Sequence, residues 1–98
     1  GQGLCLYIAD KEKFIPLKYK IQNETFIKED PLKRVWVGKD RHLHVFESTN
    51  NPDEPVRKIG VINLNDELGR DIIVDVEFLS DSQLIVTTAS KLYAVISR

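Results

Sequence analysis

Apolar residues along this chain come in short runs, each long enough for one β-strand and separated from the next by a few polar residues. β-branched and aromatic residues dominate the runs, and no long stretch keeps the i, i+3, i+4, i+7 spacing of an amphipathic helix. The pattern therefore predicts strands throughout. We place them at residues 4–9, 14–21, 33–38, 42–47, 56–64, 72–79, 84–88 and 92–97.

Polar segments rich in turn-forming residues separate these strands. The longest, residues 48–55, is interrupted by Pro52 and Pro55 and is predicted to be an exposed loop. Residues 65–71 have room for one helical turn, but Gly69 would end it. We predict a loop there as well.

Alternation along a strand decides which side chains share a face of the sheet. It places Val35 and Val37 on one face of their strand, and Leu43 and Val45 opposite His42 and His44 in the next strand. The runs 35–37 and 72–74 are apolar on both faces, which predicts sheets that are covered on both sides. Trp36 stands within the first of these runs and is expected in the core.

Composition indicates one folded domain with a thin core: of 98 residues, 42% are apolar and 30% charged. Residues 1–49 carry nine Lys and Arg against seven acids, and residues 50–98 carry five against eight. This swing from +2 to −3 is too small for the clustered basic face that nucleic acid or a membrane surface requires. We expect neither of these partners.

Cys5 is the only cysteine, so the sequence has no internal disulfide. Small secreted domains commonly rely on disulfides, and this sequence therefore predicts an intracellular protein, cytoplasmic or nuclear. The apolar runs are too short for a helix that spans a membrane. The chain begins at Gly1 and not at methionine, as a fragment of a longer protein would.

An internal repeat underlies the strand pattern. Residues 34–46 and 84–95 share the layout strand, tight polar turn, strand, and residues 3–8 resemble 91–96. Measured from Leu4 to Leu43 to Leu92, the spacings are 39 and 49 residues. A period of about 40–50 residues with four short strands in each period is typical of β-propeller blades.

Two stretches carry a resemblance to a known family. Residues 69–84 resemble the opening of a WD-repeat blade, and residues 40–47 resemble its tight turn and third strand, with Phe46 and Glu47 in place of Trp-Asp. Arg70 replaces the family's histidine, so the Asp-His-Ser-Trp hydrogen-bond network of regular WD repeats cannot form. The resemblance implies that Asp40 is a structural aspartate of the turn.

The resulting prediction is an all-β fold with about two blades' worth of antiparallel four-stranded sheets of a WD-like β-propeller. We treat residues 1–98 as one unit, in which residues 1–22 supply strands c and d of one blade. Residues 23–65 then form a complete blade, and residues 66–98 supply strands a to c of the next. The alternative is a small closed β barrel, similar to pleckstrin-homology domains.

Candidate chemistry is sparse. His42 and His44 stand two apart on a strand, but they lack the further ligands of a metal site and, with Lys39 and Arg41, are candidate surface contacts. No Gly-x-Ser-x-Gly elbow surrounds a serine, and no glycine-rich phosphate loop precedes a helix. We expect no catalytic residue, metal, cofactor or small-molecule substrate.

The predicted function is that of a non-enzymatic protein–protein interaction scaffold, a segment of a larger protein or complex. Incomplete blades leave strand edges to which a protein partner, or the remainder of the same chain, can add a strand. The candidate edge residues are Leu4, Leu6, Leu92, Tyr93 and Val95. The barrel alternative would instead bind a phosphopeptide or a lipid headgroup.

Overall fold

The computed structural model describes the backbone of residues 5–8, 13–16, 21, 23–90 and 92–96, and the side chains of residues 21 and 23–90. Within these residues the chain is mostly antiparallel β-sheet, and the predicted all-β fold is confirmed. The elements are β1 (Cys5–Ile8), β2 (Lys13–Pro16), β3 (Phe26–Glu29), β4 (Val35–Lys39), β5 (His42–Ser48), β6 (Val56–Asn63), α1 (Asn65–Leu68), β7 (Ile73–Phe78), β8 (Gln83–Thr88) and β9 (Leu92–Ile96).

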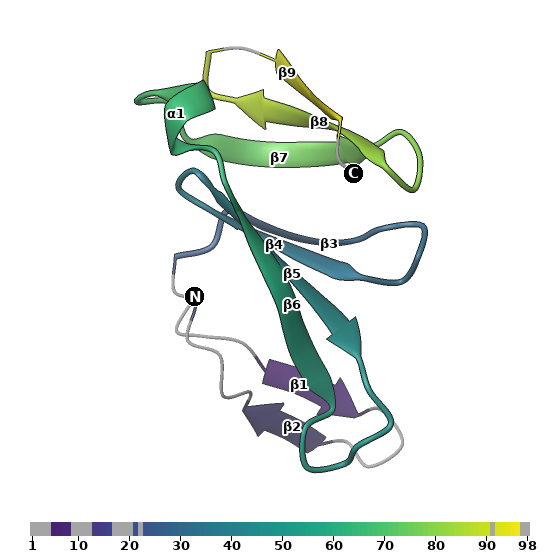
Figure 1. Ribbon diagram of the computed structural model, residues 1–98. Coiled ribbons are helices and arrows are strands. Elements are labelled where there is room, and N and C mark those ends of the chain that lie inside the picture. The colour runs from purple at the N-terminus through teal and green to yellow at the C-terminus, as the bar shows by residue number, and fades with distance from the viewer. Residues whose placement is uncertain (1–4, 9–12, 17–20, 22, 91, 97–98) are drawn as a thin grey trace.

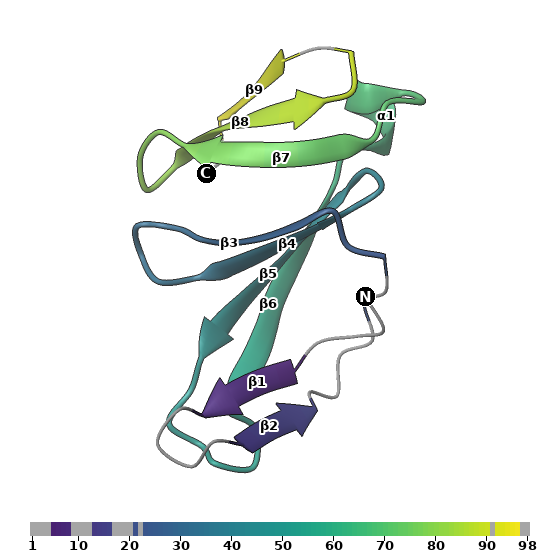
Figure 2. The same cartoon turned by 180° about the vertical axis from the view of Figure 1, so that it is seen from behind.

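The strands form three open sheets, and in each sheet every strand pairs with the next one along the chain. β1 and β2 make a two-stranded sheet, β3 to β6 a four-stranded sheet, and β7 to β9 a three-stranded sheet. Figures 1 and 2 show the four-stranded sheet between the other two. The closed-barrel alternative is wrong for the described residues, because no strand of one sheet pairs with a strand of another.

β3 is a strand that the apolar pattern does not predict. It contains only two apolar residues, Phe26 and Ile27, followed by two charged ones. β3 forms because its backbone pairs with β4, from Phe26 opposite Gly38 to Glu29 opposite Val35. The ring of Phe26 lies where a Cβ at position 38 would be, so this pairing depends on glycine.

Alternation sorts the side chains of the four-stranded sheet into two cores, as predicted. Leu43 and Val45 face the three-stranded sheet, whereas Val35 and Val37 lie in a second cluster with Ile21 and Phe46. His44 pairs with Val37 and therefore shares the second face. The first core consists of Trp36, Leu43, Val45, Leu64, Leu68, Ile73, Val76, Leu84 and Val86.

The connection between β6 and β7 forms one helical turn, where we predicted a loop. The amide of Leu68 donates to the carbonyl of Leu64 over 2.9 Å, and both side chains are buried in the first core. Burying two leucines one turn apart stabilises the helical conformation over the loop. Gly69, with φ of 61°, ends the turn as the sequence indicates.

The three-stranded sheet is covered on one face only within the described part of the chain. Ile73 is completely buried against the four-stranded sheet, whereas Ile72 and Val74 beside it are 44% and 48% exposed. The prediction that residues 72–74 belong to a sheet covered on both faces is therefore wrong here. The described chain supplies one neighbouring sheet for these strands to pack against, and that sheet lies on the Ile73 side.

Candidate interaction surface

The turn between β3 and β4 is organised around a buried carboxylate, that of Asp30. Its Oδ1 accepts hydrogen bonds from the backbone amides of Leu32 and Arg34, at 2.9 and 2.8 Å. Its Oδ2 accepts from Nε of Arg34 at 2.6 Å and from the indole Nε1 of Trp36 at 2.9 Å. Four donors therefore converge on a single side chain, which fixes residues 30–36 as one rigid unit.

The same contacts decide the charge of Asp30. Burial by itself raises the pKa of a carboxyl group, but the hydrogen bonds from Trp36 and from Arg34 outweigh it and hold the pKa of Asp30 below its usual value. Asp30 is thus a carboxylate at neutral pH, and Arg34 compensates its charge at the protein surface.

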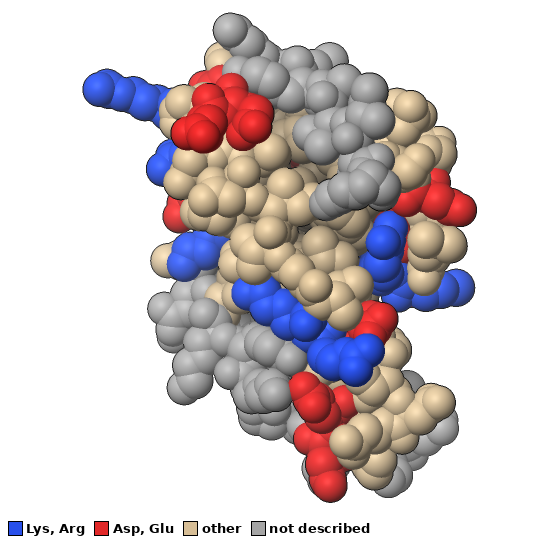
Figure 3. Space-filling model, in the orientation of Figure 1, with Lys and Arg blue, Asp and Glu red and all other residues tan. Residues whose placement is uncertain are grey.

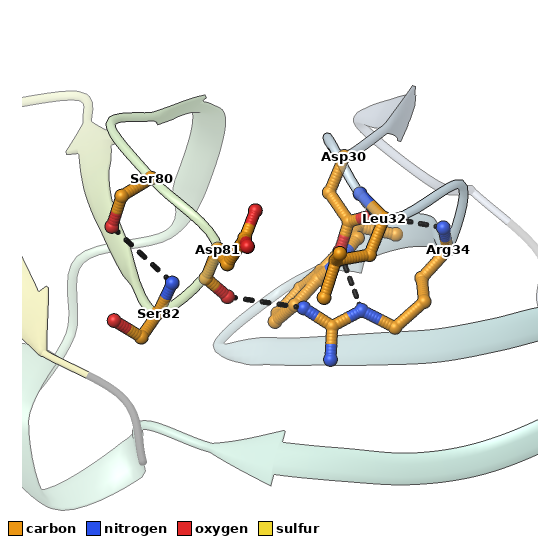
Figure 4. A network of polar contacts seen from close by, with 7 residues as sticks. Asp30, Leu32, Arg34, Ser80, Asp81 and Ser82 are labelled. Atoms are coloured by element: carbon orange, nitrogen blue, oxygen red, sulfur yellow. Dashed lines mark hydrogen bonds and ion pairs between the residues drawn. The ribbon is translucent and has the colours of Figure 1, made fainter.

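Arg34 also joins this turn to the next sheet. Its Nη2 donates to the backbone carbonyl of Asp81, in the turn between β7 and β8, over 3.3 Å. The guanidinium carbon lies 5.8 Å from the ring of Trp36, and the Trp36 ring packs 5.5 Å from that of Phe78 in β7. Figure 4 shows the two turns facing one another, with the guanidinium of Arg34 between them.

A second set of contacts joins the same two sheets at the turn between β4 and β5. Asp40 adopts a left-handed conformation, with φ of 54°, and its carbonyl accepts a 2.7 Å hydrogen bond from the amide of Ile73. The hydroxyl of Thr25 donates to the carbonyl of the same Ile73 over 2.9 Å. Asp40 therefore lies in a turn whose backbone holds the start of β7.

Charged side chains join the first strands of the two sheets. Nζ of Lys28 in β3 lies 2.9 Å from a carboxylate oxygen of Asp75 and donates to the carbonyl of Val76 over 2.8 Å. The hydrogen bond from Lys28, with a smaller opposing effect of burial, lowers the pKa of Asp75. Both side chains are partly exposed, so this pair orients the sheets more than it stabilises them.

A separate group of polar side chains lies at the start of the three-stranded sheet. Asp71 Oδ2 accepts hydrogen bonds from the hydroxyls of Ser90, at 2.7 Å, and Thr88, at 3.3 Å. Thr88 ends β8 and is buried, and Ser90 stands in the turn to β9. The carboxylate therefore connects the segment before β7 to the turn between β8 and β9.

The four predicted surface contacts lie close together around β5. Lys39 pairs with His42 across the turn, the rings of His42 and His44 lie 6.3 Å apart, and Nε of Arg41 donates to Asn65 Oδ1 over 3.1 Å. Burial, and then the positive charges of Lys58, His42 and Lys39, lower the pKa of His44. Figure 3 shows a band of Lys and Arg side chains across the middle of one face of the molecule, with acidic side chains beside it.

The predicted edge residues lie in two different sheets. Leu6 is in β1, and Leu92, Tyr93 and Val95 are in β9, while Leu4 lies outside the described residues. Among the described strands, β1 pairs with β2 only and β9 with β8 only. The structure thus places these positions in the outer strands of the first and last sheets.

No role was predicted for Asp30 or Arg34 from the sequence. The signal that could have found them is their spacing, since an Asp at the start of a turn accepts from amides two and four residues later. Trp36, expected in the core, is buried there. Its hydrogen bond to Asp30 brings the turn and the core together.

Comparisons with known proteins return nothing that constrains the function. The chain matches no family model, and it matches no curated protein and no solved structure. Within the described residues there is no helix of sufficient length and apolarity to cross a membrane. The same residues hold no group of three or more His, Cys, Asp or Glu side chains placed to bind a metal ion.

Proposed function

We propose that this chain is a non-enzymatic protein–protein interaction scaffold, built as a segment of a WD-like β-propeller. Propeller blades are four-stranded antiparallel meanders, each of which packs on its neighbours. The four-stranded sheet has this arrangement, and the three-stranded sheet packs against it with the same order of strands. The observation that carries the proposal is the exposure of Ile72 and Val74, on the side of the three-stranded sheet that faces away from the shared core, whereas Ile73 between them is buried.

On this proposal the interaction occurs at the three-stranded sheet. In the four-stranded sheet, β6 lies along β5 as the fourth strand. The equivalent place beside β9 takes a strand from a protein partner or from the remainder of the chain, through backbone hydrogen bonds. Leu92, Tyr93 and Val95 are the positions along that edge.

The polar group at Asp71 supports the propeller assignment. WD-repeat blades join the segment before strand a to the turn after strand b with a hydrogen-bond network, and this sequence lacks its residues. Asp71, Thr88 and Ser90 join the same two places by other side chains. We infer that this group replaces the network in a divergent blade.

The test is the association state of the 98-residue chain, measured by size-exclusion chromatography with light scattering over a range of concentrations. An apolar sheet face that lacks its neighbour self-associates, so we expect the apparent mass to rise with concentration. Ile72→Ser combined with Val74→Ser should reduce this rise. Ile59→Ser combined with Val61→Ser, at positions of similar exposure in β6, is the matched control and should not.

A well-folded chain that stays monomeric at every concentration would contradict the proposal. Strand addition has a separate test, which is Val95→Pro in β9. Proline removes a backbone donor and disfavours an added strand, so this variant should lose assembly with a partner or with a longer form of the chain. Unchanged assembly would count against the edge mechanism.

A further inference from the structure

The turn between β3 and β4 presents a second surface, distinct from the three-stranded sheet and its edge. It is rigid before any partner arrives, because Asp30 fixes the backbone amides of both Leu32 and Arg34. A preordered loop binds without a large entropic cost. The turn is therefore suited to binding a partner.

Some N–H groups of Arg34 are not used by its hydrogen bonds to Asp30 and Asp81. A guanidinium carries five N–H groups, and Arg34 uses Nε on Asp30 and one hydrogen of Nη2 on Asp81. Figure 4 shows its third nitrogen directed away from both of these partners. The side chain is 31% exposed, so an incoming group can reach the free donors.

The chemistry of the free donors indicates a carboxylate. Two N–H groups on one planar guanidinium match the two oxygens of a carboxylate in a bidentate pair. Asp30 and Asp81 already supply negative charge to this neighbourhood, which disfavours the doubly charged phosphate group more than a singly charged carboxylate. An acidic side chain of another protein is therefore the best match.

Leu32 supplies the apolar part of the surface. It stands two residues before Arg34, and its side chain is 52% exposed although its backbone is fixed. An extended peptide places side chains two residues apart on the same side, about 7 Å from one another. A segment that carries an acid and an aliphatic residue spaced by one residue offers one side chain to each of the two positions.

We propose that the surface formed by Leu32, Arg34 and Asp81 binds an acidic and aliphatic peptide segment of a partner protein. A partner carboxylate pairs with the free N–H groups of Arg34, and a neighbouring aliphatic side chain packs on Leu32. The surface lies on the turns and not on the free edge of β9. It can therefore be occupied whether or not another sheet completes the propeller.

The test uses the 98-residue chain and two synthetic peptides, one that repeats the unit Glu-Ser-Leu-Ser, so that Glu and Leu lie two residues apart on one side of the extended peptide, and a matched one with Gln in place of every Glu. Binding is measured by changes in the amide NMR signals. The Glu peptide should shift the signals of residues 32–34 and 80–82. The affinity of the Gln peptide should be lower by a factor of about ten or more. Raising the salt concentration to about 0.5 M should lower the affinity of the chain for the Glu peptide.

Three variants make the test specific. Leu32→Ser keeps the backbone contacts and should lower the affinity for the Glu peptide several-fold. Ile59→Ser, in β6, should leave this affinity unchanged. Asp81→Asn keeps the carbonyl that Arg34 binds and removes a nearby negative charge, so it should strengthen binding. Equal binding of the two peptides, shifts elsewhere on the molecule, or no effect of Leu32→Ser would each overturn the proposal.

Discussion

The four-stranded and three-stranded sheets have the same order of strands but differ in how far apolar residues that are adjacent in the sequence are buried. In the four-stranded sheet, Trp36 faces one core and Val37, the next residue, faces the other. In the three-stranded sheet, Ile73 is buried and Val74, the next residue, is half exposed. The same apolar pattern thus has two outcomes: Val37 is packed in the second cluster, whereas Val74 lies where the pairing of β7 with β8 is irregular and is left half exposed.

This difference shows that the hydrogen-bond pairing that forms a strand and the apolar burial that stabilises it have separate sources. Each strand of the three-stranded sheet finds its hydrogen-bond partner within a local meander. Stability comes chiefly from burying apolar surface on both faces. We therefore expect the four-stranded sheet to be the more stable of the two, and the following predictions test that expectation.

The largest effect is expected in the core that the two sheets share. Leu43 is completely buried there, and Leu43→Ala should lower the free energy of unfolding by about 2–5 kcal/mol, since it removes buried methyl groups and leaves a cavity. Urea denaturation followed by circular dichroism measures this change. A loss below about 1 kcal/mol would mean that the site collapses around the smaller side chain and that the sheets are loosely packed.

Next in size is the buried carboxylate that joins the turns. Asp30→Ala leaves the buried indole N–H of Trp36 without its acceptor and frees two backbone amides. We expect a loss of about 2–3 kcal/mol, a typical result for unsatisfied buried donors. Urea denaturation measures it, with Trp36 fluorescence as the probe of the local environment.

Asp30→Asn is the matched variant, because an amide oxygen still accepts hydrogen bonds. It should retain part of the stability that Asp30→Ala loses. Stability that is equal in Asp30→Ala and in the natural chain would show that the turn is held by other contacts.

A smaller effect concerns pH and His44 on the second face of the four-stranded sheet. Its pKa is lowered in the folded protein, so the unfolded chain binds more protons in the window between the folded pKa and 6.5. The free energy of unfolding should therefore rise with pH through this window and level off above it. His44→Gln should reduce this dependence, and an unchanged pH profile in that variant would assign the dependence to other groups.

The smallest effect is expected on the uncovered face. Val74→Ser replaces a half-exposed side chain and should change the free energy of unfolding of the isolated chain by no more than about 0.5 kcal/mol. Val76→Ser, two residues on and completely buried, should be far more costly. Equal losses in the two variants would show that Val74 is packed in solution.

The apolar pattern predicted most of the strands and the faces of β4 and β5, because alternation is a local property of the sequence. It missed β3, whose pairing depends on Gly38 making room for Phe26. It also missed the role of Asp30, because the donors that meet its carboxylate come together only when β4 and its turn have formed. The exposure of Val74 could not be predicted either, since Val74 lies at an irregularity in the pairing of β7 with β8 that is not evident from the apolar pattern.

The central claim, that the described part of the chain covers only one face of the three-stranded sheet, is tested most directly by native-state hydrogen exchange. β5 and β8 are matched for this purpose, because each pairs with a strand on both sides. We predict that the amides of β5 exchange only through global unfolding, whereas those of β8 exchange through a partial opening of lower free energy. Equal free energies of exchange for the two strands would contradict the claim.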